Sequence, residues 1–168
     1  PLSTAPSSPA LSSPPRVRLM GMPVDAVTET AAITYILEKL DAGQGGWVIT
    51  PNLDQLRQYH RWPELRPMYE RAQLVLADGM PLLWAARLQG TPLPERVAGS
   101  ELIYTLIAAA ANAGRSVFLL GGNLGAAEGA AAKLNELKPA LGTVGTHFPP
   151  LGFEKDPAQM AQIIQALQ

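Results

Sequence analysis

The sequence contains no cysteine and only two histidines, His60 and His147, which lie far apart along the chain. The lack of cysteine excludes a disulfide framework and a thiolate metal site, and two isolated histidines do not make a zinc site. This composition is compatible with a reducing, cytoplasmic setting. No motif surrounds either histidine, so we expect both to be solvated side chains without a catalytic role.

Charged residues are also scarce, because they make up only 16% of the 168 residues and leave a formal net charge of -1. A chain without a broad basic surface has no electrostatic support for binding nucleic-acid phosphates, so nucleic acid is not an expected partner. Charged, glycine or proline positions interrupt every apolar run well before the roughly 20 residues that a membrane-spanning helix needs. The sequence therefore predicts no membrane span.

What the chain does have is apolar material, since 47% of its residues are hydrophobic. This is ample for one buried core, and a single core typically covers roughly 100–200 residues. Residues 1–15 are rich in proline, serine and alanine and lack the basic and apolar stretches of a secretory signal. We therefore predict a flexible tail over 1–15 and one folded domain over 16–168.

Short β-like runs alternate with helix-like segments from Arg16 onward, a pattern typical of a parallel sheet covered by crossover helices. The predicted strands are 16–20, 47–50, 74–77, 116–120 and 141–145, the fourth with the continuous apolar character of a sheet centre. The predicted helices are 24–40, 53–60, 81–88, 100–112, 124–137 and a last one opened by Asp156-Pro157. The predicted fold class is α/β, with a Rossmann-like sheet. A crossover helix normally leads to another strand, so we expect the domain to lack its last strand or strands after Gln168.

Ligands of open α/β sheets bind beyond the carboxyl ends of the strands, so the loops at those ends are the candidate sites. Thr50 and Asn52 offer a hydroxyl and an amide that could bind sugar hydroxyls, although a helix cap is the more common role for residues of this kind. Asp78 ends the third predicted strand beside Gly79, and its carboxylate is the candidate general base. The alternative is that Asp78 caps the helix that follows.

Two further segments could bind phosphate. Gly121-Gly122-Asn123 connects an apolar strand to a helix, where glycine lets a diphosphate approach free backbone N–H groups, although an unliganded Gly-Gly turn is also common. Arg96 could pair with phosphate in a bidentate manner, or simply neighbour Glu95 on the surface. The other acidic residues considered are predicted to lie on solvated faces; they are Asp54, Glu64, Glu95 and Glu101.

The order of these motifs is more specific than any one of them. It runs Gly21-Met22-Pro23-Val24-Asp25, Thr50-Pro51-Asn52, Ala77-Asp78-Gly79-Met80-Pro81, Arg96-Val97-Ala98-Gly99-Ser100 and Val117-Phe118-Leu119-Leu120-Gly121-Gly122. This series resembles the WecG/TagA/CpsF family of bacterial glycosyltransferases and covers nearly everything from Met20 to Leu167. The domain over 16–168 is thus expected to be a glycosyltransferase domain, incomplete at its C-terminus because family members continue with further segments and an arginine-containing, membrane-proximal tail.

The resemblance implies an inverting transfer of N-acetylmannosaminuronate, N-acetylmannosamine or a related hexose. The implied donor is a UDP-sugar, the acceptor is a polyprenyl-diphosphate-linked sugar, and the place is the inner face of the cytoplasmic membrane, which the protein would contact peripherally. Asp78 matches the family's proposed base, Thr50 and Asn52 match pocket positions, and Arg96 and Gly121-Gly122 match other signature positions. The sequence has no Asp-x-Asp pair, so we expect neither a metal ion nor another cofactor.

Two other functions stay open at this point. A strand-Gly-Gly-helix connection could belong to a Rossmann-like oxidoreductase that uses NAD(P), although the GxGxxG fingerprint is missing. The chain could also be a non-catalytic binding or scaffold fragment. In that case an exposed sheet edge would favour self-association into a homo-oligomer.

Overall fold

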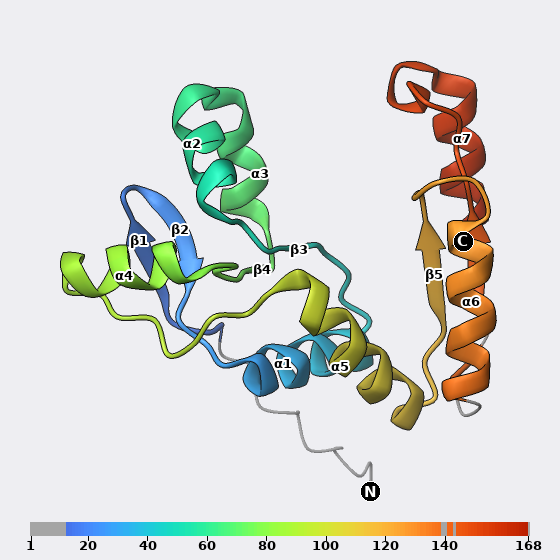
Figure 1. Ribbon diagram of the computed structural model, residues 1–168, viewed down its shortest axis with the longest axis horizontal. Coiled ribbons are helices and arrows are strands. Elements are labelled where there is room, and N and C mark those ends of the chain that lie inside the picture. The colour runs from blue at the N-terminus through green and yellow to red at the C-terminus, as the bar shows by residue number, and fades with distance from the viewer. Residues whose placement is uncertain (1–12, 139–140, 143, 168) are drawn as a thin grey trace, which may run out of the picture. The chain divides into compact units, whose positions relative to one another are not determined.

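The computed structural model describes residues 13–138, 141–142 and 144–167, so most of the predicted tail lies outside the described residues (Figure 1). The chain forms two compact units, Pro1–Ile103 and Tyr104–Gln168, which are described separately below. In the described ranges, no helix combines the length and the apolar character that crossing a bilayer requires.

The first unit opens with an antiparallel hairpin in which β1 (Arg16–Leu19) pairs with β2 (Met22–Asp25). Its two-residue turn has positive φ at both positions, 48° at Met20 and 90° at Gly21, the geometry that suits the twist of a tight hairpin. The prediction of a helix from residue 24 was therefore wrong at its start. All four residues of β2 are buried. The first turn of a surface helix would instead leave some of its residues exposed.

The first helix, α1 (Glu29–Asp41), begins four residues after the hairpin, where the Thr28 side chain accepts a hydrogen bond from Ala31 N. A parallel pair follows, formed by β3 (Val48–Ile49) and β4 (Leu74–Val75). The crossover between these strands holds three short helices, α2 (Leu53–Arg61), η1 (Pro63–Leu65) and α3 (Arg66–Arg71). The strand–helix–strand unit predicted over 47–77 is confirmed.

The core of the first unit gathers residues from the hairpin, from the crossover and from α4 (Met80–Gln89), which lies beside β1 (Figure 1). Its most deeply buried members include Leu19, Met22, Val24, Tyr69, Val75 and Leu82. A final helix, α5 (Gly99–Asn112), starts in this unit. It begins at Gly99, one residue before the start predicted from the sequence.

A buried charged residue lies at the end of β2. Asp25, only 3% exposed, ends β2 and accepts hydrogen bonds from Arg16 Nε at 2.8 Å and Arg16 Nη2 at 2.9 Å. Its Oδ2 atom also accepts from the backbone N of Val75 at 2.7 Å. The hydrogen bonding to Asp25 raises the pKa of Arg16 above its ordinary value, and the charge of Asp25 adds to this. Asp25 thus ties the hairpin to β4.

The second unit pairs β5 (Val117–Leu120) in parallel with β6 (Val144–His147) and carries α6 (Ala126–Leu137), η2 (Phe153–Lys155) and α7 (Pro157–Ala166). As predicted, Asp156 caps α7 and Pro157 occupies its first turn. β6 overlaps the strand predicted over 141–145 at Val144 and Gly145 and ends two residues later, at His147. β5 is half-buried at three positions and exposed at Leu120, so it lacks the full burial expected of a sheet centre in the part of the chain that is described.

The predicted α/β class is confirmed, with helices joining short parallel strand pairs. The described strands form three separate pairs, the first antiparallel, rather than the single parallel sheet that the alternation suggested.

Candidate functional site

The carboxyl ends of β3 and β4 meet the segment before α5 in the first unit. Backbone pairing continues past both strands, because Asp78 N donates to Pro51 O at 2.9 Å. On its other side β4 is joined by the loop before α5, since Val97 N donates to Ala77 O at 2.9 Å. The structure therefore brings together three of the loops that the sequence singled out.

Asp78 lies at the centre of these loops with 30% of its side chain exposed. The helix cap proposed as its alternative role belongs to Gly79, whose φ of 130° favours glycine and which caps α4 without any side-chain hydrogen bond. Asp78 instead faces an open cleft of about 410 Å³. The other lining residues are Asn52, Leu53, Asp54, Arg57, Gly79 and Pro81. A half-exposed carboxylate in such a cleft can accept a proton from a bound hydroxyl.

Arg96 reaches this carboxylate from the loop before α5. Its Nη1 lies 3.8 Å from Asp78 Oδ1, and its Nη2 donates to the two carboxylate oxygens of Glu101 at 2.5 and 2.7 Å. The hydrogen bonds to Glu101 raise the pKa of Arg96 above its ordinary value, and the charges of Glu101 and Asp78 add to this. Glu101 therefore holds the guanidinium beside Asp78.

The sequence missed this role of Glu101, which was predicted to lie on a solvated face, and it proposed Glu95 as the neighbour of Arg96. Glu95 is instead the acceptor for the backbone N of Glu29. One signal in the sequence could have indicated this pair. Glu101 follows Arg96 by five residues and lies in the first turn of α5.

Asn52 has the structural role that was weighed against sugar binding. Its Oδ1 accepts from Asp54 N at 3.0 Å and Gln55 N at 3.1 Å, and Gln55 Oε1 accepts from Asn52 N at 2.8 Å, which completes a capping box on α2. The residue is nevertheless exposed and lines the Asp78 cleft. Only its amide NH2 group remains to donate to a ligand.

Thr50 packs against the start of α5 rather than lining the cleft. A Cβ atom built on Gly99 would lie 2.6 Å from Thr50 Oγ1, well inside contact distance. Glycine at position 99 therefore lets the loop that carries Arg96 approach the end of β3.

This close approach makes Gly99→Ala a sharp test of the packing. We expect the substitution to lower the free energy of unfolding by about 1–3 kcal/mol, because Thr50 must move to admit the methyl group. Denaturant unfolding checks the magnitude. In a double-mutant cycle, Thr50→Ala removes the clashing hydroxyl and should recover part of the loss, whereas strictly additive effects would contradict the contact.

The Gly121-Gly122-Asn123 turn belongs to the second unit. Gly121 and Gly122 have φ values of 92° and 88°, which side chains rarely adopt, and Gly121 N donates to His147 O at 2.9 Å. The helix begins at Ala126 rather than at residue 124, so the turn is longer than predicted. Gly122 and Asn123 are exposed, which leaves their backbone accessible to a ligand.

The two histidines differ from each other. His60 is exposed, as predicted, and lines a second open cavity on α2. His147 was expected to be solvated, but it ends β6 half-buried with an Nε2 atom that is shielded and without a hydrogen-bond partner in the described structure. Among the residues placed in space, no group of three His, Asp or Glu side chains gathers closely enough to hold a metal ion.

The fold and these loops define an α/β protein with an aspartate–arginine pair at the carboxyl ends of its parallel strands. The chain belongs to the glycosyl transferase WecG/TagA/CpsF family, whose model matches residues 17–168. It is therefore a glycosyltransferase of cell-surface polysaccharide synthesis, acting between a sugar donor and an acceptor. A comparison with curated proteins gave no match.

Proposed function

We propose that the protein transfers N-acetylmannosaminuronate, N-acetylmannosamine or a related hexose from a UDP-sugar to a polyprenyl-diphosphate-linked acceptor, with inversion at the anomeric carbon. The observation that carries this proposal is the Asp78 carboxylate, which faces an open cleft and lies 3.8 Å from the Arg96 guanidinium. A lipid-linked acceptor implies that the protein works at the inner face of the cytoplasmic membrane.

In the proposed reaction Asp78 accepts the proton of the acceptor hydroxyl. The hydroxyl oxygen then forms a bond to the anomeric carbon as the bond from that carbon to the UDP oxygen breaks, and the bonding electron pair leaves with UDP. Negative charge therefore grows on the diphosphate in the transition state, where a fixed cation is most effective. Arg96 supplies that cation, and Glu101 keeps it in position.

The remaining substrate contacts follow from the loops already described. The Asn52 amide in the cleft would position a sugar hydroxyl, and Thr50, packed against Gly99, would position the loop that carries Arg96. In the second unit, the backbone of Gly121-Gly122-Asn123 is a separate candidate for binding phosphate. No contact in this scheme requires a metal ion.

Metal independence gives a direct prediction. Sugar transfer should proceed at the same rate with excess chelator as with added Mg²⁺ or Mn²⁺, because the Arg96 guanidinium supplies the positive charge that stabilises the leaving group. Transfer of radiolabelled sugar to extracted lipid acceptor measures this rate. Loss of activity with chelator, restored by one divalent ion, would contradict the proposed mechanism.

The donor is tested by calorimetric titration of the purified protein with UDP and, as a control, with NADP⁺. Binding of UDP together with a higher melting temperature in its presence would support the donor assignment. Failure to bind UDP or any UDP-sugar would overturn it. Fractionation of cells, with a salt wash of the membranes, tests the proposed location.

A further inference from the structure

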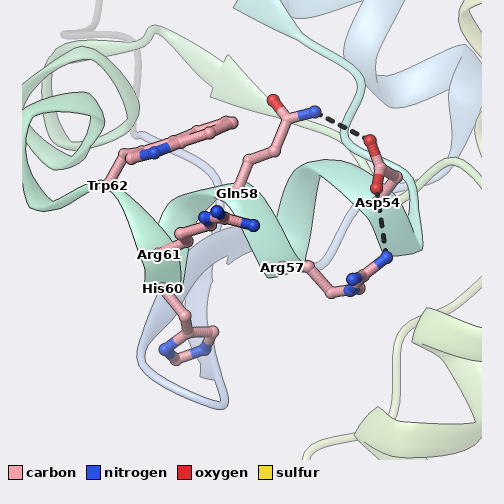
Figure 2. A pocket seen from close by; sticks show the side chains of 6 residues that line it. All are labelled: Asp54, Arg57, Gln58, His60, Arg61 and Trp62. Atoms are coloured by element: carbon pink, nitrogen blue, oxygen red, sulfur yellow. Dashed lines mark hydrogen bonds and ion pairs between the residues drawn. The ribbon is translucent and has the colours of Figure 1, made fainter.

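A second cavity adjoins the Asp78 cleft along α2. It has a volume of about 680 Å³ and is lined by Asp54, Arg57, Gln58, His60, Arg61 and Trp62, the side chains drawn in Figure 2. Asp54 and Arg57 also line the cleft that contains Asp78. The two cavities are therefore neighbours that share part of one wall, and together they are here called the α2 groove.

Two arginines, one helical turn apart, dominate the charge of the α2 groove beyond Asp78. Arg57 and Arg61 lie at positions i and i+4 of α2, and Figure 2 shows both side chains extending from the same side of the helix. The carboxylate among the lining residues is Asp54, which precedes both arginines on α2 and accepts a hydrogen bond from Gln58 Nε2 at 2.7 Å. The second cavity thus has an excess of positive charge in a chain whose net charge is -1.

Both guanidinium groups are placed to accept an anion. Arg57 Nη1 lies 3.5 Å from Asp54 Oδ1, and the two side chains are 76% and 64% exposed, so this ion pair is weak and can be exchanged for a phosphate. Arg61 lies over the Trp62 ring, with its guanidinium carbon 5.6 Å from the ring centroid. A guanidinium resting on an indole keeps all of its N–H donors free for a bidentate anion.

From these observations we infer that the α2 groove binds the diphosphate of the lipid-linked acceptor through Arg57 and Arg61. This inference rests on the proposed function, because it takes the acceptor to be a polyprenyl diphosphate. Its acceptor sugar would then extend toward Asp78, through the cavity that Arg57 shares with the base. Its first isoprene carbons would lie against Trp62, whose indole is 41% exposed and suits the boundary between a charged headgroup and an apolar chain.

The test uses the double variant Arg57→Gln/Arg61→Gln and the matched control Arg87→Gln. Arg87 is an exposed arginine on α4 that lines neither cavity of the groove. We expect the double variant to raise KM for the lipid-linked acceptor by about tenfold or more, since it removes two charge-assisted contacts. KM for the UDP-sugar should not change. Farnesyl diphosphate, used as a soluble probe in calorimetry, should bind the wild type and Arg87→Gln but not the double variant.

A UDP-sugar also carries a diphosphate, and the two sources are separated by which KM responds. An unchanged acceptor KM would overturn the inference, and so would a rise confined to the UDP-sugar, which would assign the arginines to the nucleotide. The probe titration does not depend on turnover. If the protein failed to use any UDP-sugar, the proposed function would fall, while loss of farnesyl diphosphate binding in the double variant would still support the anion site.

The lysine double variant, Arg57→Lys/Arg61→Lys, separates charge from geometry. It keeps both charges but loses the planar fork, so acceptor KM should fall between the wild-type and glutamine values. All of these side chains are exposed, and the melting temperatures of the variants should match the wild type. If the lysine variant folded normally but had an acceptor KM as high as the glutamine variant, the two side chains would not bind the diphosphate through their charge.

Discussion

Asp78→Asn is expected to lower kcat for sugar transfer by about 10³-fold, because an amide cannot accept the proton of the acceptor hydroxyl. Asparagine has the same shape and preserves the backbone bond from position 78 to Pro51 O, so the fold should be unaffected. The carboxylate is 30% exposed and its nearest cation, Arg96, keeps two hydrogen bonds to Glu101. UDP binding, measured by calorimetry, should therefore change far less than turnover.

A suitable control for this prediction is Glu38→Gln, which neutralises an exposed carboxylate on α1 outside the Asp78 cleft. Its kcat should equal that of the wild type. If Asp78→Asn kept full turnover, Asp78 could not be the base. If the variant lost UDP binding and turnover in the same proportion, Asp78 would be a binding residue instead.

Local signals in the sequence predicted much of the helical structure. Pro81 and Pro157 occupy first turns, where a missing N–H costs nothing, and Asp156 caps α7 as its side chain allows. These features depend on neighbours within one turn, so a single sequence reveals them. The hairpin was missed because it lacks the usual local signal. Its turn is Met20-Gly21 rather than Asn-Gly, and its buried strand β2 has the apolar character of a helix face.

The candidate site was only partly predictable from the sequence. Asp78 and Arg96 could be chosen because strand ends attract ligands and because their motifs follow a family order, and the structure places the two residues together. The partner of Arg96 could not be predicted in this way. Nothing in the sequence distinguishes Glu101 from other surface carboxylates, and only the folded loop before α5 brings it to Arg96. The α2 groove was missed for a similar reason. Its arginines are ordinary surface residues in sequence, and only the folded structure shows that the cavity they line together is a neighbour of the Asp78 cleft.

The largest expected effect on stability comes from a residue that the sequence analysis did not single out. Asp25→Ala should lower the free energy of unfolding by about 3–5 kcal/mol, the usual cost of breaking a buried ion pair on one side. The change leaves the Val75 N–H buried without its acceptor and deprives Arg16 of its carboxylate. Arg16 is 28% exposed in its side chain and keeps a hydrogen bond to Ala72 O at 3.0 Å, which favours the lower end of this range.

Denaturant unfolding measures this loss, and a fall in melting temperature of roughly 10 °C should accompany it. The matched control is Glu70→Gln, which removes the carboxylate from the second ion pair of the hairpin. Arg18 and Glu70 have side chains that are 57% and 41% exposed, so this pair should contribute less than about 1 kcal/mol. The hydrogen bond from Arg18 lowers the pKa of Glu70, so its contribution is present at neutral pH and is lost as the pH falls through the lowered pKa.

The double variant Arg16→Met/Asp25→Leu distinguishes an unpaired charge from lost packing. Replacing both partners by apolar side chains removes the buried guanidinium together with the carboxylate, so stability should recover relative to Asp25→Ala. Recovery should stop short of the wild type, because the Val75 N–H still lacks an acceptor. Since Val75 lies three residues before Asp78, any residual shift of β4 should also appear as reduced turnover in the folded fraction. A double variant no more stable than Asp25→Ala would show that the pair acts mainly by anchoring β4 to the hairpin.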